Sequence, residues 1–127
     1  MKAFCLLNHT LTEKQENELL NKYNCDKIIY PSKELSAVWA QVPAVPENDR
    51  NIIKAVTTWL ESAEENDVLV IQGEFGATFI MVDYALKNKI IPLHAVTKRV
   101  ETEQRDGEIV HKQYVFEHVC FRRYEYY

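Results

Sequence analysis

Short apolar runs alternate with amphipathic stretches along the first three quarters of the chain. Each run has the length of a strand that is buried on both faces. These runs lie at residues 3–7, 27–30, 68–71 and 90–96. The stretches between them place apolar residues at helical spacing. They cover residues 12–23, a helical turn at 33–40 within a proline-containing connection, a helix at 47–63 and an almost wholly apolar helix at 77–89.

This alternation predicts an α/β fold. A strand, a helix and a second strand in succession form a right-handed crossover between parallel strands. We therefore expect a compact, Rossmann-like and mostly parallel sheet flanked by helices. These elements form the core, residues 1–98, of a single domain that spans residues 1–127.

The last quarter of the chain has a different, more polar pattern. Two polar strands, at 99–105 and 108–116, surround Asp106-Gly107. This dipeptide is the strongest short signal for a two-residue hairpin turn. We expect a C-terminal β-hairpin and a closing segment, together residues 99–127.

Composition limits the classes of function. The chain has 15 basic and 19 acidic residues and a net charge of −4, so it lacks the basic excess of proteins that coat DNA or RNA. No apolar run approaches the roughly 20 residues that span a bilayer, and the N-terminal apolar run is too short for a secretory signal. Three widely separated cysteines do not indicate a disulfide framework. We expect a cytoplasmic protein that binds neither membranes nor nucleic acids in general.

Polar segments follow three of the predicted strands. The carboxyl ends of parallel strands meet at one edge of a sheet, and ligands bind there where the strand order reverses. The segments are Asn8–Thr10, Gln72–Thr78 and Thr97–Arg99. The sequence therefore predicts one ligand site built from all three.

The second segment carries two of the three glycines and precedes a helix. Free backbone N–H groups and the positive end of the helix dipole favour an anion there, most often a phosphate. Gly73-x-x-Gly76 is neither a P-loop nor the dinucleotide fingerprint, so a tight turn without a ligand is an equal alternative. Glu74 would repel an anion, which leaves open whether it binds a sugar or adenine group or points away. The candidate binding residues are Gln72, Gly73, Glu74, Phe75, Gly76, Ala77 and Thr78.

Titratable side chains accompany the other two segments. His9 is a candidate acid or base near neutral pH, with Asn8 and Thr10 as neighbouring donors, although a loop histidine that meets solvent is commoner. Thr97 precedes Lys98 and Arg99, and an arginine fork suits a phosphate. A solvated charged surface is the alternative for this pair.

The remaining histidines do not indicate a metal site. His94 lies within an apolar strand and is expected in the core, and His111 and His118 have no metal-ligand spacing. We predict no metal and no cofactor. Arg122-Arg123 serves either the same ligand site or only the surface.

Four segments together resemble a small CRISPR-associated ring nuclease family of type III systems, number twenty of the Csx group. They read Leu-Leu-Asn-His-x-Leu-Thr at 6–12, Gln-Gly-Glu-Phe-Gly-Ala-Thr-Phe at 72–79, Ile-Pro-Leu-His-Ala-Val-Thr-Lys-Arg at 91–99 and Phe-Glu-His-Val-x-Phe-Arg-x-Tyr at 116–124. The resemblance implies a compact relative of the CRISPR-associated Rossmann (CARF) fold that binds cyclic oligoadenylates. It also implies a homodimer, whose two-fold symmetry matches a ring of four identical nucleotides.

The resemblance further implies metal-independent cleavage of cyclic tetra-adenylate, the signal of type III antiviral immunity. A ribose 2′-hydroxyl attacks the neighbouring phosphorus and leaves a 2′,3′-cyclic phosphate. On this hypothesis His9 is the general base, Arg99 with Lys98 stabilises the phosphorane, and Thr78 donates to a phosphate. A cyclic-nucleotide sensor that does not cut, or a protein-interaction domain, is the alternative.

Overall fold

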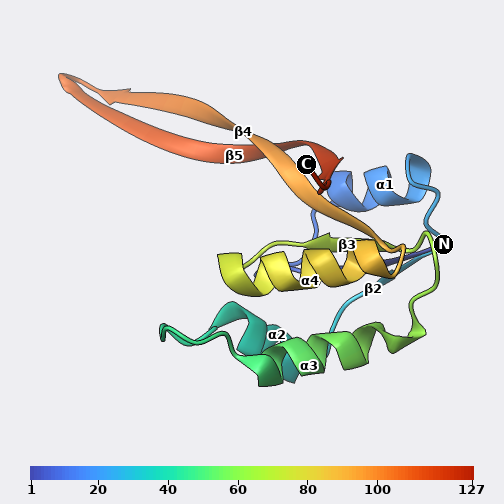
Figure 1. Cartoon of the computed structure of the whole chain (residues 1–127). Helices are drawn as coiled ribbons and strands as arrows, with labels where there is room; N and C mark the ends of the chain where they lie inside the picture. Colours follow the sequence, from blue (N-terminus) through green and yellow to red (C-terminus); the bar gives the residue numbers. More distant parts are fainter.

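The computed structural model describes all 127 residues, which form one sheet with helices on both faces (Figure 1). The strands are β1 (Lys2–Leu6), β2 (Lys27–Ile29), β3 (Val68–Ile71), β4 (Ile91–Asp106) and β5 (Ile109–Arg123). The helices are α1 (Glu13–Asn21), α2 (Lys33–Ala40), α3 (Arg50–Trp59) and α4 (Phe75–Lys87), with a 3₁₀ turn at Leu60–Ser62. All elements expected before residue 96 are present, and the expected turn at 33–40 is a complete helix. None of the helices is long and apolar enough to cross a membrane.

The five strands lie in the order β2-β1-β3-β4-β5. β1 is parallel to both β2 and β3, and β3 is parallel to β4, but β5 runs antiparallel to β4. The fold is α/β as expected, but its sheet is mixed rather than mostly parallel, because the longest ladder is the antiparallel one. The chain steps from β1 to β2 on one side and returns to β3 on the other, so the strand order reverses between β1 and β3.

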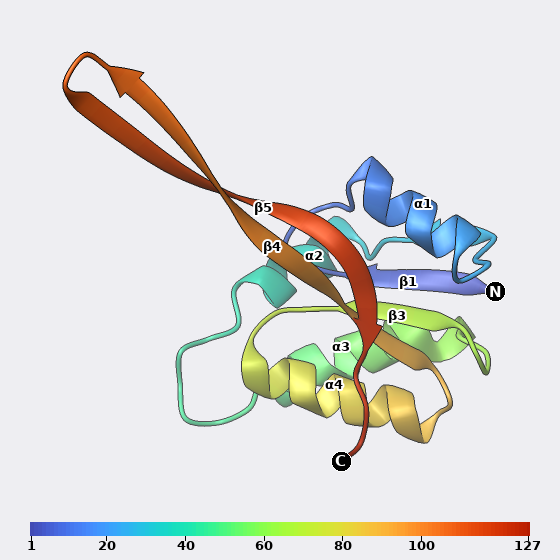
Figure 2. The ribbon, with the colours of Figure 1, turned by 90° about the horizontal axis from the view of Figure 1, so that it is seen from above.

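Helices cover both faces of the parallel strands (Figure 2). On one face, Leu19 of α1 belongs to an apolar cluster with Val70. On the other face, Met81 of α4 belongs to a cluster with Ile71, to which α2 and α3 also contribute. Successive residues of β3 point to opposite faces. Burial on both faces explains why β3 is an uninterrupted apolar run. We call residues 1–96, together with residues 120–123 of β5, the body.

β4 continues without a break past the predicted strand end at residue 96. It runs for 16 residues, from Ile91 to Asp106, because the polar residues after 96 pair with β5 instead of forming a loop. The register shifts by one residue just beyond the pair Val96–Cys120. From there the two strands leave the body as a projecting ribbon, residues 97–118, which we call the arm (Figures 1 and 2).

The turn of the arm lies one residue later than predicted. Asp106 pairs with Ile109, so the two central turn residues are Gly107 and Glu108. Gly107 has a φ of 61°, a conformation that glycine adopts without strain and that a type II′ hairpin turn requires at its first central position. The hairpin prediction is therefore confirmed, and its register is corrected.

Candidate functional site

The loops after β1 and β3 lie side by side at one edge of the sheet. The two strands are parallel and in register from Ala3–Val68 to Leu6–Ile71, so Asn8 and Gln72 follow neighbouring strand ends. The strand order reverses between these strands, which is where ligands bind in open α/β sheets. The structure thus brings together the first two of the three predicted segments. We call this edge the carboxyl edge.

The third predicted segment lies elsewhere. Ala95 N donates to Gln72 Oε1 at 3.0 Å, so Ala95 marks the level of the carboxyl edge on β4. Arg99 is four residues further along the strand, or about 13 Å at 3.3 Å per residue. Its guanidinium carbon lies 4.6 Å from the centroid of the Tyr114 ring, within the arm. The prediction that Thr97–Arg99 is a loop after a strand is wrong, because these residues continue the ladder with β5.

The N-terminus of α4 is occupied by its own capping residue. Glu74 Oε1 accepts from Gly76 N at 3.0 Å, and Oε2 accepts from Ala77 N at 2.7 Å. The bonds from Ala77 and Gly76 lower the pKa of Glu74. The N–H groups of Gly76 and Ala77, predicted to hold a phosphate, therefore already bind a carboxylate. This also answers the open question about Glu74, which caps the helix.

Packing explains Gly73 of this turn. A Cβ at Gly73 would lie 2.6 Å from Nε1 of the buried Trp39, the nitrogen that donates to Gln72 O at 3.0 Å. A Cβ at Gly76 would lie 2.9 Å from Asn48 Oδ1, the tip of an exposed side chain that can move aside. The contact at Gly73 supports the alternative in which the turn is tight for packing reasons.

A cavity of about 470 Å³ opens where β1 and β2 end. We call it the histidine pocket. His9 Nδ1 lies 2.8 Å from Thr10 O. Because a carbonyl oxygen only accepts, Nδ1 carries the proton of the neutral imidazole and Nε2 keeps a free lone pair. His9 is exposed, so this nitrogen can act as a base on a bound ligand. The lining residues are Cys5, Leu7, Asn8, His9, Thr10, Tyr30, Pro31, Lys33, Ser36, Ala37 and Ala40.

Three polar residues of this pocket were missed by the sequence analysis: Tyr30, Lys33 and Ser36. They follow β2, which is parallel to β1 and therefore ends at the same edge. The sequence could have indicated these residues, because the segment after every parallel strand reaches this edge of the sheet. The prolines around this segment led instead to the prediction of a connection with one helical turn at 33–40, and its polar residues were not considered for the site. Lys33 is the cationic side chain that lines this pocket, where Lys98 and Arg99 were predicted to lie.

Cys5 also lines the histidine pocket, but it is unsuited as a nucleophile. Its side chain is 1% exposed, and burial raises its pKa to about 12. At neutral pH it is a thiol rather than the reactive thiolate. Tyr30 is fixed as well, because its hydroxyl donates to Glu16 Oε1 at 3.1 Å and accepts from Leu11 N at 3.3 Å. His9 is therefore the lining side chain with a free basic nitrogen.

A second cavity, of about 360 Å³, lies where β3 ends, and we call it the aromatic pocket. Phe75 and Phe79 on α4 are 92% and 74% exposed, although Phe79 lies in the stretch that predicts an almost wholly apolar helix. Thr78 is buried and its hydroxyl has no hydrogen-bond partner, a defect that costs about 1–3 kcal/mol. The lining residues are Gln72, Gly73, Phe75, Thr78, Phe79, Val82 and Tyr124.

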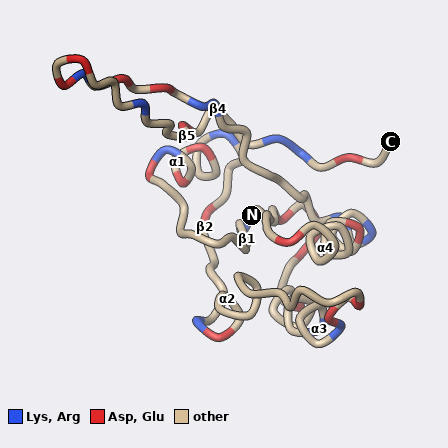
Figure 3. The backbone as a smooth tube through the Cα atoms, turned by 90° about the vertical axis from the view of Figure 1, so that its left-hand side faces the viewer, with Lys and Arg blue, Asp and Glu red and all other residues tan.

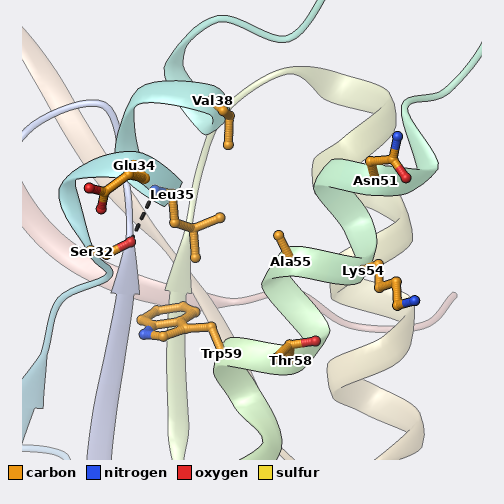
Figure 4. A pocket seen from close by; sticks show the side chains of 9 residues that line it. All are labelled: Ser32, Glu34, Leu35, Val38, Asn51, Lys54, Ala55, Thr58 and Trp59. Atoms are coloured by element: carbon orange, nitrogen blue, oxygen red, sulfur yellow. Dashed lines mark hydrogen bonds between the residues drawn. The ribbon is translucent and has the colours of Figure 1, made fainter.

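The largest cavity lies between α2 and α3 and contains none of the predicted residues. It measures about 630 Å³ and is lined mostly by apolar surface. Figure 4 shows Leu35, Ala55 and Trp59 around this groove, with Lys54 at its margin. Its polar lining side chains are Ser32, Glu34, Asn51, Lys54 and Thr58, and no histidine or cysteine is among them.

His118 is a structural residue at the junction of body and arm. Its Nε2 lies 2.7 Å from Glu18 Oε1, and its Nδ1 lies 3.4 Å from Gln15 Nε2. Glu18 Oε2 accepts from Phe121 N at 2.7 Å. Both imidazole nitrogens are thus engaged, and α1 is tied to β5. No group of three His, Cys, Asp or Glu side chains that could hold a metal ion is present.

Comparisons with other proteins concern almost the whole chain. A family model described as "Uncharacterized protein MJ1673 family" matches residues 1–122. A relative from Methanocaldococcus jannaschii, described as "Uncharacterized protein MJ1673", is 37% identical over 128 residues, which cover 99% of this chain and 98% of the relative. No solved structure matches the chain. The region matched by the family model includes the arm and every lining residue of the two pockets at the carboxyl edge except Tyr124.

Proposed function

The chain belongs to the MJ1673 family, and we propose that this member binds a cyclic oligoadenylate, specifically cyclic tetra-adenylate, at its carboxyl edge and cleaves it. Cleavage would end the antiviral signal of type III CRISPR systems, the role implied by the resemblance in four sequence segments. The proposal includes a CARF-like fold and a cytoplasmic location. Three unpaired cysteines suit a reducing compartment.

One observation carries this proposal. The histidine pocket contains both the free Nε2 of His9, which follows β1, and Lys33, which follows β2. β1 borders the point where the strand order reverses. Cleavage by an internal 2′-hydroxyl requires a base for that hydroxyl, a cation near the phosphate and a fixed in-line pose. The pocket offers the first two, and Asn8 and Ser36 add hydrogen-bonding groups that would orient a ribose.

The proposed reaction requires no added nucleophile. His9 Nε2 takes the proton of a ribose 2′-hydroxyl, and the 2′-oxygen bonds the neighbouring phosphorus. The bond from phosphorus to the 5′-oxygen breaks, and that oxygen takes up a proton. The products are a 2′,3′-cyclic phosphate and a free 5′-hydroxyl. Lys33 stabilises the negative charge that develops on the phosphorane oxygens.

We also propose that two copies of the chain form a homodimer through their arms. Phe116, Ile109 and Val115 are 73%, 58% and 50% exposed. A free two-stranded ribbon is marginally stable in water, and exposed apolar side chains on it favour a partner. In this arrangement the arm of one copy brings Lys98 and Arg99 to the ligand on the other. That placement would restore the predicted role of Arg99, which lies outside both pockets of its own chain.

A sensor that binds the cyclic nucleotide without cutting it is the second candidate. Its support is the position of Arg99 on the arm, away from His9 in the same chain. In addition, the N–H groups of α4 are already bound to Glu74. Under this alternative, binding is retained and no bond breaks.

Incubation of the purified protein with radiolabelled cyclic tetra-adenylate in excess EDTA separates the two candidates. We expect linear fragments that end in a 2′,3′-cyclic phosphate. An intact cyclic molecule after incubation with stoichiometric protein would refute the enzyme. Cyclic tri- and hexa-adenylate in parallel reactions define which size the site prefers. Absence of binding to all three would refute the sensor as well.

A further inference from the structure

We propose that the aromatic pocket is a binding site for a neutral planar heterocycle, the adenine base of an adenylate. The choice of adenine rests on the proposed function, whereas the chemistry of the pocket rests on its own residues. All seven lining residues are uncharged, in contrast to the histidine pocket with its Lys33. A phosphate therefore has no counter-charge in the aromatic pocket, and a neutral group is the suitable occupant.

Aromatic side chains form much of its surface. Phe75 and Phe79 are one helical turn apart on α4, so they lie on the same face of the helix. Their exposed fractions, 92% and 74%, leave their rings open to a ligand. Tyr124 lines the same pocket and is held in place by two contacts. Its hydroxyl donates to Ile71 O at 2.7 Å, and the centroid of its ring lies 4.7 Å from the centroid of the His94 ring. Bases stack on such side chains in proteins that bind single-stranded nucleic acids.

Gln72 adds a polar group of defined orientation. Its Oε1 accepts from Ala95 N, and a backbone N–H can only donate, so the amide orientation is settled. The Nε2 group has no partner in the protein and is not a buried atom, which leaves its two hydrogens for a ligand. Ring nitrogens of adenine are acceptors and fit this donor.

Thr78 gives a second, independent indication of a ligand. It is 9% exposed, it lines this pocket, and its hydroxyl lacks a hydrogen-bond partner. An unpartnered buried hydroxyl is unfavourable in a folded protein. The two pockets of the carboxyl edge thus bind different parts of the ligand. The histidine pocket binds ribose and phosphate, and the aromatic pocket binds a base.

The test measures affinity by calorimetry for three probes: cyclic tetra-adenylate, adenosine 5′-monophosphate and ribose 5-phosphate, which lacks the base. Phe75→Ala and Phe79→Ala should each lower the affinity for the two adenine-containing probes roughly 5- to 150-fold, the range for loss of one stacked base. Gln72→Glu keeps the acceptor for Ala95 N and removes the donor, so it should also weaken both probes at least about fivefold. Binding of ribose 5-phosphate should be unchanged in the two Phe variants, which keep the charge of the site. Leu20→Ala, an exposed apolar residue on the opposite face, is the matched control.

The outcomes separate this inference from the proposed function. Wild-type affinity of the Phe75, Phe79 and Gln72 variants for both adenine probes would overturn the base site, even if cyclic tetra-adenylate is cleaved. Binding of adenosine 5′-monophosphate that depends on these residues, without cleavage of the cyclic molecule, would refute the enzyme and support the base site. If the Phe variants instead convert a dimer into a monomer and leave affinity per site unchanged, the pocket is an interface between copies and the inference is overturned.

Discussion

The body and the arm share two strands, β4 and β5, but these strands lie in opposite surroundings in the two regions. In the body, Leu93 and Phe121 are 0% and 4% exposed and belong to the same apolar cluster. In the arm, Phe116 is 73% exposed. The same ladder is therefore supported by helices at one end and by nothing within the chain at the other (Figure 1).

This difference separates the two parts of the proposed activity. Helices cover both faces of the sheet in the body. The chain alone therefore fixes the positions of His9, Gln72 and the two pockets that they line. The arm carries Lys98 and Arg99 together with mixed charges near its tip (Figure 3). Its Glu101–Lys112 pair, at 3.4 Å, is exposed and contributes at most about 1 kcal/mol. Few contacts within the chain therefore fix the position of the arm.

The largest expected effect is on stability, from matched truncations in the two regions. Leu69→Ala should lower the free energy of unfolding by about 2–5 kcal/mol, because the side chain is fully buried and its removal leaves a cavity. Val115→Ala should change it by no more than about 0.5 kcal/mol, since this side chain is half exposed on the arm. Urea denaturation of a monomeric preparation measures both. Equal losses would show that the arm is as well packed as the body.

A smaller effect is expected at the junction of the two regions. Glu18→Ala removes the acceptor of Phe121 N and of the His118 imidazole and should cost about 1–3 kcal/mol. Hydrogen exchange should accelerate in residues 116–121 and remain unchanged in β1. Glu61→Ala, at an exposed position without such contacts, is the control. Unchanged exchange in 116–121 would mean that α1 does not hold the arm.

The role of the arm in association can be tested at Phe116. Phe116→Glu places a charge on its exposed apolar surface and should convert a dimer into a monomer in sedimentation velocity. Leu20→Glu, at an exposed apolar position on α1, should leave the mass unchanged. A wild-type protein that is monomeric at all concentrations, or a Phe116→Glu variant that remains dimeric, would contradict the proposed pairing of arms.

The smallest effect concerns the cap of α4 and its dependence on pH. Hydrogen bonds from Ala77 and Gly76 lower the pKa of Glu74 from its ordinary 4.5. Its contribution to stability is therefore present above pH 4.5 and is lost as the pH falls through the lowered value. We expect Glu74→Gln to melt slightly below wild type at about pH 6, with a difference that shrinks under acid. A difference that is constant with pH would exclude ionised Glu74 as the cap.

The elements of the body could be predicted from the sequence because burial on both faces leaves a direct pattern. Val68–Ile71 is apolar and β-branched at nearly every position, a pattern that is typical of a central strand. The continuity of β4 could not be predicted. Thr97, Lys98 and Arg99 form a polar run that is typical of a loop, and only the pairing with β5 makes them a strand.

The candidate site was predicted in part for the same reason. Parallel strands end at one edge, and this geometry correctly placed Asn8 next to Gln72. Lys33 was missed because the proline-containing segment after β2 was interpreted as a connection and not as a further polar segment at the edge of the sheet. The exposure of Phe75 and Phe79 could not be predicted either, because α4 is apolar on nearly every side and its pattern does not indicate which face meets solvent.

Single-turnover cleavage of cyclic tetra-adenylate by wild type and His9→Ala, in EDTA and with protein in excess, tests the central claim most directly. The account predicts that wild type produces fragments with 2′,3′-cyclic phosphate ends and that His9→Ala is slower by about 10²–10⁴, the usual contribution of a general base. Equal rates for the two proteins would contradict the role of the histidine pocket in catalysis.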